Sequence, residues 1–461
     1  MNSNVITVFE YGFLSSAVSD NRCAKISPDA FKYLESLCLN QASEMKHFLR
    51  LRSYNGERAL QLKHYVGVIQ IPNGEQIEVL PKVGKVSNEA TADKQTKDNS
   101  RKSLLNMLKT MNGFRHVEST DAQVEQHKMP LFEVFIRQFL QSVNQLVKRG
   151  LRSDYVSQQE NLLFLKGKLL TSQQLKYNLV NKHKFYVEYD EYLLDRPANR
   201  LIHTALNKIA SYTKNNAHQR LCRELSFAFN DIPVSNNIKQ DFAQVKPNRG
   251  MSYYQTPLAW AKLILEGMTP LAMKGKANAI SLLFPMHDIF ESYVGNVIKS
   301  QLQDNYSLEE QARSEYLVQH EDDEWFNLKP DFLINKRDTN LLVLDTKWKL
   351  LNASQDNGSD KYGLSQNDFY QMFAYGHKYL NGKGNLVLIY PKTEKFTKAI
   401  KHSFDFSGEL KLWVVPFDIS DREDDSNRFD FSDEPTIRTL IGKIFKPNID
   451  DCNINWLSSD Y

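Results

Sequence analysis

Residues 329–349, KPDFLINKRDTNLLVLDTKWK, carry the strongest structural signal in the chain. They contain two apolar runs separated by a short polar segment, a pattern that predicts two strands joined by a tight turn. Asp331 opens the first run and Asp345 lies near the end of the second. Because paired strands lie side by side, we expect the two carboxylates to come together at one end of a hairpin.

Asp345 and Lys347 are two residues apart. On a strand, this spacing places both side chains on one face, whereas Thr346 and Trp348 point to the other. The preceding LLVL run is typical of a strand buried on both sides, which would hold its polar end rigidly. Lys349 lies on the same predicted face and is a second candidate amine, ranked lower because it is farther from Asp345.

This residue set suits phosphodiester hydrolysis, which needs an activated water and stabilisation of the charge that develops on the phosphoryl oxygens. Paired carboxylates offer hard oxygen ligands for Mg²⁺, with Mn²⁺ as an alternative, and a bound cation lowers the pKa of its water. A nearby ammonium orients the water or stabilises the charge, and whether it also acts as the base stays open. We therefore predict a metal-dependent site on Asp331, Asp345 and Lys347. The alternative is a surface hairpin with an ordinary Asp and Lys.

Two helices flank the hairpin in sequence and add candidates. Glu291 lies on a predicted helix over residues 287–302, and Gln371 and Tyr375 lie on another over residues 367–380. The Q-x-x-x-Y spacing places the last two on one helical face. The alternatives are a solvated acid at Glu291, an ordinary polar residue at Gln371 and a core aromatic residue at Tyr375.

The P-D…D-x-K pattern resembles that of the restriction-endonuclease-like PD-(D/E)xK superfamily. In that superfamily a preceding helix often adds an acidic metal ligand, here Glu291, and a subset carries a similar Q-x-x-x-Y motif. The order of DRPANRLI, PD…DTKWK, YQMFAY and LIYP is similar to that of the McrC family, nuclease subunits of McrBC modification-dependent restriction systems. The resemblance spans roughly residues 120–400 and implies an α/β fold with a core of a mixed sheet flanked by helices.

The same resemblance implies a DNA endonuclease that cleaves double-stranded DNA in a 5-methylcytosine-dependent system, with Asp331, Asp345 and Lys347 at the matching catalytic positions. It also implies a hetero-oligomeric complex with a McrB-like AAA+ GTPase hexamer that binds GTP and whose GTPase this chain stimulates. A catalytically degenerate assembly factor and a stand-alone DNA repair nuclease are the alternatives.

The chain lacks a GTP-binding motif of its own, which agrees with a separate GTPase partner. Each Gly-Lys pair is followed by Val, Leu, Ala, Gly or Ile, so the chain has no P-loop for GTP. The sequence also lacks the H-E-x-x-H zinc pair and the G-x-S-x-G elbow, which excludes the commonest metalloprotease and serine-hydrolase sites.

Sequence patterning predicts four segments. The first holds two turn signals, Asn55-Gly56 and Pro72-Asn73-Gly74, which predict a meander of three strands after one short helix. A polar stretch follows, and then apolar residues recur at helical spacing before the pattern changes near residue 280. The predicted segments are a β-rich N-terminal partner-docking domain over 1–85, a polar linker or loop over 86–103, a mainly helical middle region over 104–275 and a nuclease domain over 276–461.

Composition narrows the class of protein. The 58 basic and 55 acidic residues nearly cancel, so a nucleic-acid surface would have to be local. The four cysteines are far apart, which excludes a C-x-x-C zinc site and favours a reducing compartment. With no apolar run of membrane-spanning length and no signal peptide pattern, we expect a cytoplasmic protein without a membrane partner.

Overall fold

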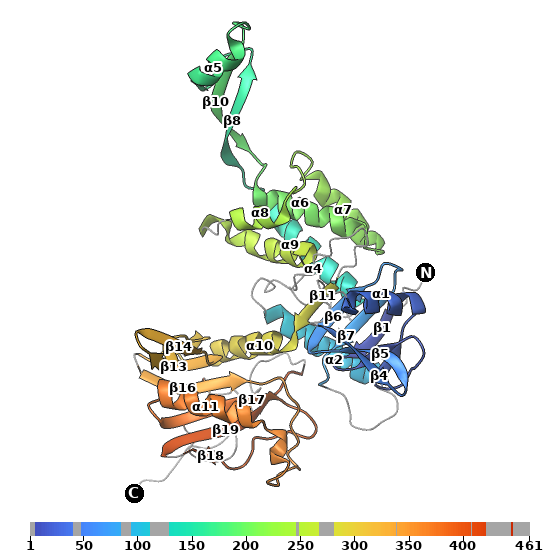
Figure 1. The fold of residues 1–461 in the computed structure, drawn as a ribbon, viewed down its shortest axis with the longest axis vertical. Coiled ribbons are helices and arrows are strands. Elements are labelled where there is room, and N and C mark those ends of the chain that lie inside the picture. Colours follow the sequence, from blue (N-terminus) through green and yellow to red (C-terminus); the bar gives the residue numbers. More distant parts are fainter. Residues whose placement is uncertain are drawn as a thin grey trace, which may run out of the picture. The chain divides into compact units, whose positions relative to one another are not determined.

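The computed structural model describes residues 5–39, 48–83, 94–110, 129–245, 249–266, 281–337, 339–406, 408–420 and 444–445. The chain forms two compact units, whose elements are labelled in Figure 1. Unit 1 contains Met1–Asn112 and Leu283–Tyr461, and unit 2 contains Gly113–Leu282. The segments predicted as an N-terminal domain and a nuclease domain thus pack together in one unit, although the middle region separates them in sequence.

Strands dominate the N-terminal part of unit 1. Its described elements are β1 (Val5–Phe9), β2 (Phe13–Ser15), β3 (Cys23–Lys25), α1 (Pro28–Leu39), β4 (Leu49–Tyr54), β5 (Glu57–Leu62), β6 (Tyr65–Gln70) and β7 (Gln76–Leu80). One sheet has the order β1-β7-β6-β11, where β11 is Ser281–Pro285, and a second has the order β3-β2-β5-β4. The predicted meander of three strands was wrong, because residues 58–71 do not form one strand. The chain leaves the second sheet after β5 and enters the first at β6.

The two predicted turns are present. Asn55 and Gly56 join β4 to β5 with φ values of 51° and 82°. Both are positive, as a two-residue hairpin turn of the favoured type requires. Gly74, with φ 91°, lies between β6 and β7, and its N–H donates to the Ile71 carbonyl at 2.9 Å.

The predicted linker over residues 86–103 needs correction. Residues 86–93 lie outside the described residues, but the chain from Lys94 onward is helical in α2 (Lys94–Thr110). The first half of this helix is polar and its buried apolar residues, Leu104, Met107 and Leu108, lie only in the second half. Composition therefore indicated a linker, whereas packing against β7 and α10 (Met286–Gln301) stabilises a helix.

Helices dominate unit 2, as the sequence predicted. The long helix α4 (Leu131–Arg149) buries its apolar stripe and is capped at its C-terminus by Gly150, whose φ is 93°. None of the described helices is long and apolar enough to cross a membrane. The main helices of unit 2 are α4 (Leu131–Arg149), α6 (Pro197–Ala210), α7 (Asn216–Phe227), α8 (Ile238–Gln244) and α9 (Gln255–Glu266).

An arm extends from the helices of unit 2 (Figure 1). It is built from β8 (Asp154–Leu162), β9 (Lys168–Leu169), α5 (Thr171–Asn178) and β10 (Phe185–Leu193), with strand order β8-β10-β9. Large apolar side chains are exposed along it. They are Tyr155, Leu163, Phe164, Leu165, Leu175, Tyr177, Leu179, Val180 and Tyr192.

The C-terminal part of unit 1 is a mixed sheet flanked by helices, as predicted. Its order is β12 (Ser307–Glu310), β15 (Phe332–Lys336), β16 (Thr339–Thr346), β17 (Lys383–Pro391), β19 (Glu409–Phe417) and β18 (Phe404–Asp405). The central strands β16, β17 and β19 are parallel and the outer pairs are antiparallel. This arrangement places the carboxyl ends of β16 and β17 next to each other.

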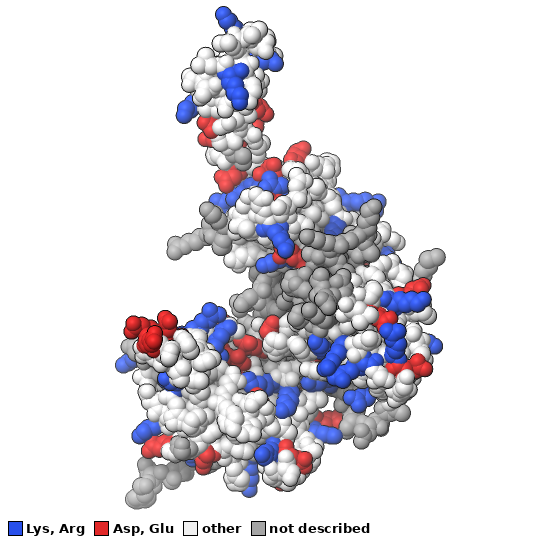
Figure 2. Space-filling view, in the orientation of Figure 1, with Lys and Arg blue, Asp and Glu red and all other residues white. Residues whose placement is uncertain are grey.

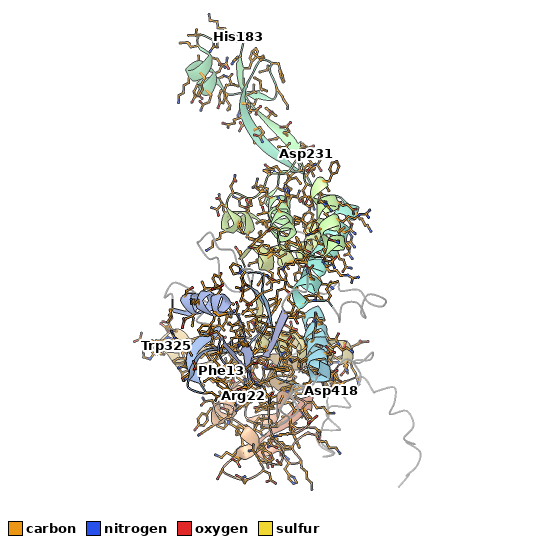
Figure 3. The ribbon with its side chains drawn as sticks, turned by 90° about the vertical axis from the view of Figure 1, so that its right-hand side faces the viewer. Phe13, Arg22, His183, Asp231, Trp325 and Asp418 are labelled. Atoms are coloured by element: carbon orange, nitrogen blue, oxygen red, sulfur yellow. The ribbon has the colours of Figure 1, made fainter. Side chains whose placement is uncertain are left out.

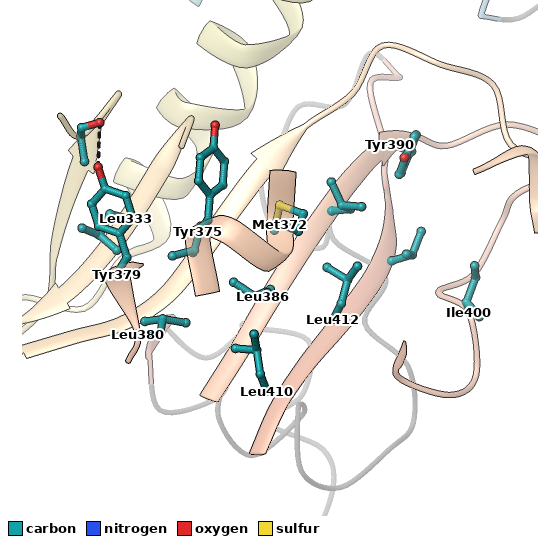
Figure 4. Packing of buried hydrophobic residues seen from close by; sticks show 14 of the residues in the cluster. Leu333, Met372, Tyr375, Tyr379, Leu380, Leu386, Tyr390, Ile400, Leu410 and Leu412 are labelled. Atoms are coloured by element: carbon teal, nitrogen blue, oxygen red, sulfur yellow. Dashed lines mark hydrogen bonds between the residues drawn. The ribbon is translucent and has the colours of Figure 1, made fainter. Parts of the chain in front are cut away.

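Helices cover both faces of this sheet. Met372 and Tyr375 of α11 (Gln366–Tyr379) pack on Leu386 and Leu412, in the buried cluster of Figure 4. Helix α10 covers the opposite face, where Phe290 and Tyr293 contact the ring of Phe417 with centroids 6.0 and 5.8 Å apart. A hairpin of β13 (Glu315–His320) and β14 (Asp323–Leu328) lies beside α11.

Candidate active site

Asp331 and Asp345 meet at the end of the β15–β16 hairpin. Phe332 pairs with Leu344 in the antiparallel register, so Asp331 and Asp345 follow as the next opposed positions. Asp345 also pairs with Leu388 of the parallel strand β17. The Lys347 N–H donates to the Ile389 carbonyl at 2.9 Å, which continues this pairing beyond the end of β16. The sheet therefore fixes the backbone beneath both carboxylates and the lysine.

Asp345 is the most buried acid of the site, with 1% of its surface exposed. Its Oδ2 accepts a hydrogen bond from the Lys347 ammonium, while its Oδ1 is buried with no hydrogen-bond partner among the described residues. The pKa of Asp345 is raised to about 7, because burial and the negative charge of Asp331 together outweigh the opposing Lys347 ammonium. A buried carboxylate oxygen without a donor is a place where a cation would be stabilised.

Asp331 is held by Thr346. Its Oδ2 accepts from the Thr346 N–H at 2.7 Å and from the Thr346 hydroxyl at 2.6 Å. Burial raises the pKa of Asp331, and these two hydrogen bonds and the Lys347 charge oppose the rise. The sequence analysis placed Thr346 on a packing face and missed this contact. Alternation within one strand could not reveal it, because Asp331 precedes β15 and turns toward the end of the neighbouring strand.

Lys347 is positioned by α11. Its ammonium donates to Gln371 Oε1 at 3.1 Å, the Gln371 amide donates to the Tyr375 hydroxyl at 2.6 Å, and that hydroxyl donates to the Lys329 carbonyl at 2.8 Å. Burial lowers the pKa of Lys347, but the Asp345 and Asp331 carboxylates outweigh it, so the pKa lies above its usual value. The ammonium stays charged and is held in one place by a chain of hydrogen bonds.

Gln371 and Tyr375 thus act through other residues. Tyr375 is 3% exposed and packs in the core, and burial raises the pKa of its hydroxyl, which stays protonated. Tyr375 is thus a core aromatic residue that also contacts Gln371 of the candidate site. Neither side chain is bonded to the two aspartates, so the structure gives both a positioning role.

Glu291 faces the same group of charges from α10. Its Oε1 accepts from the Gln311 amide at 2.8 Å. The pKa of Glu291 is raised to about 7, first by burial and then by the negative charge of Asp331. The acid is therefore close enough to Asp331 to be repelled by it, and is not the solvated helix acid of the alternative interpretation.

The donor set fits a divalent cation, although the described residues contain no group of three acidic, His or Cys side chains already converged as ligands. Asp331 and Asp345 repel each other in a buried position, and Asp345 Oδ1 has no donor. A hard cation would reduce the repulsion between the two carboxylates and give Asp345 Oδ1 a partner, with water at the remaining coordination positions. Glu291 lies at the edge of this set, bonded to Gln311.

Trp348 fixes the chain just beyond the lysine, and its role was also missed from the sequence. Its indole N–H donates to Glu10 Oε1 at 2.6 Å, and its ring lies 5.2 Å from that of Phe290. Glu10 is 3% exposed and also accepts from the Lys82 N–H at 3.1 Å. The Lys82 ammonium donates to the Trp348 carbonyl at 3.5 Å. The competing amine Lys349 has no contact with the aspartates and lies close enough to Lys82 to lower the pKa of that lysine.

Two solved structures contain chains that are similar to this one. A chain in the refined half-complex from the tetradecameric assembly of Thermococcus gammatolerans McrB AAA+ hexamers with bound McrC is similar, with a TM-score of 0.60 and 19% identity over 90% of this chain and 94% of that chain. A second chain, from the cryo-EM structure of the Thermococcus gammatolerans McrBC complex, has a TM-score of 0.44 and 20% identity over 64% of this chain and 87% of that chain. The first likeness shows a shared fold.

No curated protein sequence matches the chain. The model of one family, however, the McrBC 5-methylcytosine restriction system component, matches residues 60–391, which hold every candidate residue of the site from Glu291 to Tyr375. Since this match covers well over half of the sequence, the chain belongs to that family.

Proposed function

We propose that this chain is the DNA endonuclease subunit of a modification-dependent restriction system and hydrolyses phosphodiester bonds of double-stranded DNA. The observation that carries the proposal is the convergence of Asp331, Asp345 and Lys347 at the end of β16, with a buried carboxylate oxygen left without a donor. Family membership supports the same activity.

The catalytic roles follow from chemistry. Asp331 and Asp345 would hold Mg²⁺, or Mn²⁺, with Glu291 at the edge of the site, and the bound cation supplies Lewis acidity toward water and phosphate. Lys347 would place its ammonium against the phosphoryl oxygens, where it stabilises developing negative charge. Thr346 keeps Asp331 oriented. Gln371 and Tyr375 hold Lys347, so that the amine is already in position when the substrate arrives.

The proposal includes a McrB-like AAA+ GTPase partner that binds GTP in place of this chain. Support comes from the similar chain that belongs to an assembly of McrB hexamers with bound McrC. The sequence analysis placed partner docking in residues 1–85. The arm of unit 2 is a second candidate surface, because exposed apolar side chains such as Leu163, Phe164 and Leu165 gather there.

The test is cleavage of 5-methylcytosine-containing plasmid by the chain with its cognate GTPase, Mg²⁺ and GTP. We expect cutting by the unsubstituted chain and none by Asp345→Ala. Asp405→Ala is the matched control, because Asp405 is an exposed acid on an edge strand of the same sheet and should leave cutting unchanged. Undiminished cutting by Asp345→Ala would refute the assignment.

Two further outcomes separate the alternatives. Stimulation of the partner GTPase without nicking under either metal would identify an assembly factor. Strong cutting without GTP or partner would identify a stand-alone nuclease.

A further inference from the structure

An open groove of about 520 Å³ lies between the two N-terminal sheets of unit 1. It runs along the edge strands β1 and β3. Four basic residues line it, namely Arg22, Lys25, Lys82 and Lys97. Figure 3 labels Arg22 beside Phe13, on the loop that leads into β3. Nothing in the site described above uses the outer part of this groove.

The groove also contains two acidic residues, of which Glu10 is buried and Asp20 is exposed. Asp20 Oδ1 accepts hydrogen bonds from the backbone N–H groups of Arg22 and Cys23 at 2.8 and 2.9 Å, so this carboxylate stabilises the turn that leads into β3. Glu10 is buried and accepts from Trp348 and Lys82. Asp20 lies close enough to Arg22, and Glu10 close enough to Lys82, for opposite charges to attract, but neither acid forms an ion pair with Lys25 or Lys97 within the described residues.

Three of the four basic side chains of the groove lack the ion pairs that comparable residues have. Elsewhere in the N-terminal part, Arg58 is paired with Glu35 and Arg101 with Glu78. By contrast, within the described residues Arg22, Lys25 and Lys97 form no ion pair. Arg22 and Lys25 are also exposed. Their charges are available to an anion from solvent.

One end of the groove reaches the candidate active site. Lys82 lines the groove, and its ammonium donates to the carbonyl of Trp348, the residue that follows Lys347. Lys349 is the next cation, close enough to Lys82 for the two charges to repel. Lys82 therefore connects the groove to the backbone of the residue next to the candidate catalytic lysine.

The opposite side of the site has the opposite charge. The tip of the β13–β14 hairpin carries four exposed acids, Glu321, Asp322, Asp323 and Glu324, which form the red patch of Figure 2. Lys and Arg side chains gather instead over the region of α2 and β7. A polyanion bound at the site would be repelled from the hairpin and attracted along the groove.

We infer that the groove binds the sugar-phosphate backbone of duplex DNA beside the scissile bond, with Arg22, Lys25 and Lys97 as phosphate contacts. The inference rests on the proposed nuclease function and adds a DNA-binding surface outside the catalytic sheet. Contacts of this kind are independent of base sequence, so the groove positions the strand without reading it.

The test measures the salt dependence of DNA binding, with EDTA present so that no cleavage occurs. The full chain binds a fluorescent duplex between 50 and 200 mM salt, and is compared with Arg22→Gln/Lys25→Gln/Lys97→Gln. A matched control, Lys32→Gln/Arg50→Gln/Arg52→Gln, removes the same charge from exposed residues of α1 and β4 that do not line the groove.

Each phosphate contact contributes about 0.9 to the slope of log affinity against log salt. Loss of three contacts should lower the slope by about 2.7, so that the affinity ratio of parent to groove variant falls about 40-fold across this salt range. The control variant should keep the parental slope.

An unchanged slope in the groove variant, an equal loss in the control or no DNA binding by the parent would overturn the inference. Loss of partner-dependent GTPase stimulation with an unchanged slope would also overturn it and would indicate an acidic protein segment as the occupant. The proposed function is judged separately, by plasmid cleavage with the parent and Asp345→Ala: cleavage that persists while the slope is unchanged refutes the groove and leaves the nuclease proposal standing.

Discussion

Asp345 makes a prediction about stability that does not depend on cleavage. Without metal, folding forces this carboxyl into a site where its pKa rises from 3.8 to about 7. The folded protein then binds a proton at Asp345 more tightly than the unfolded chain does. The contribution of Asp345 to the free energy of unfolding is therefore largest below pH 4 and is lost as the pH rises toward 7. Asp345→Asn removes the titrating group and leaves a side chain of the same shape.

The size of the effect follows from the shift. The pKa of Asp345 rises by about three units, and about two of these units lie between pH 5 and pH 7. Over that range the free energy of unfolding therefore changes by about 3 kcal/mol. The free energy of unfolding of the metal-free parent should therefore fall by about this amount, relative to Asp345→Asn, between pH 5 and pH 8. Lys347 does not contribute to the pH dependence of stability between pH 5 and pH 8, because its pKa lies above its usual value and its ammonium stays charged throughout.

The assay is denaturant unfolding of both proteins in EDTA at the two pH values, followed by the same measurement with Mg²⁺. Mg²⁺ at 100 times its Kd should restore about 2.7 kcal/mol to the parent at pH 8 and much less to the variant. Parallel stability curves for the two proteins between pH 5 and pH 8 would refute the reasoning. A smaller difference at pH 8 than at pH 5 would show that the sign is wrong.

Three further predictions concern the neighbours of this carboxyl. Lys347→Met should abolish cleavage while Lys349→Met keeps most of it, and equal loss in a plasmid assay would contradict the choice between the amines. Tyr375→Phe removes the hydroxyl that holds Gln371, so kcat should fall about 5-fold with KM unchanged, since one hydrogen bond is worth about 1 kcal/mol; a change confined to KM would argue against a positioning role. Glu10→Ala leaves the Trp348 indole N–H without its acceptor and should lower the free energy of unfolding by about 1–3 kcal/mol, whereas Glu10→Gln keeps an acceptor oxygen and should lose less in the same denaturant titration.

The hairpin and the candidate residues were predictable from local sequence, for a definite reason. Side-chain alternation is a property of the strand itself, so D-T-K alone places Asp345 and Lys347 together. The P-D pair, the intervening turn and the apolar run then set the register that opposes Asp331 to Asp345. The same holds for the Q-x-x-x-Y spacing, which is a property of any helix.

Other features depend on contacts between segments far apart in the chain. The break after β5 and the helix α2 were missed, because each is decided by the sheet or helix against which it packs. The Thr346 contact to Asp331 depends on how the chain turns before β15.

What the sequence by itself determined is the set of candidate residues: two acids and an amine on adjacent strands, and a Gln and a Tyr on one face of a later helix. What only the tertiary structure decided is their environment. Glu10 and Trp348 are 338 residues apart and meet because the first and last segments of the chain fold into one unit. Burial of Asp345 and the carboxylate oxygen that it leaves without a donor also arise from tertiary packing, because desolvation and charge depend on everything nearby in space, whatever its place in the chain.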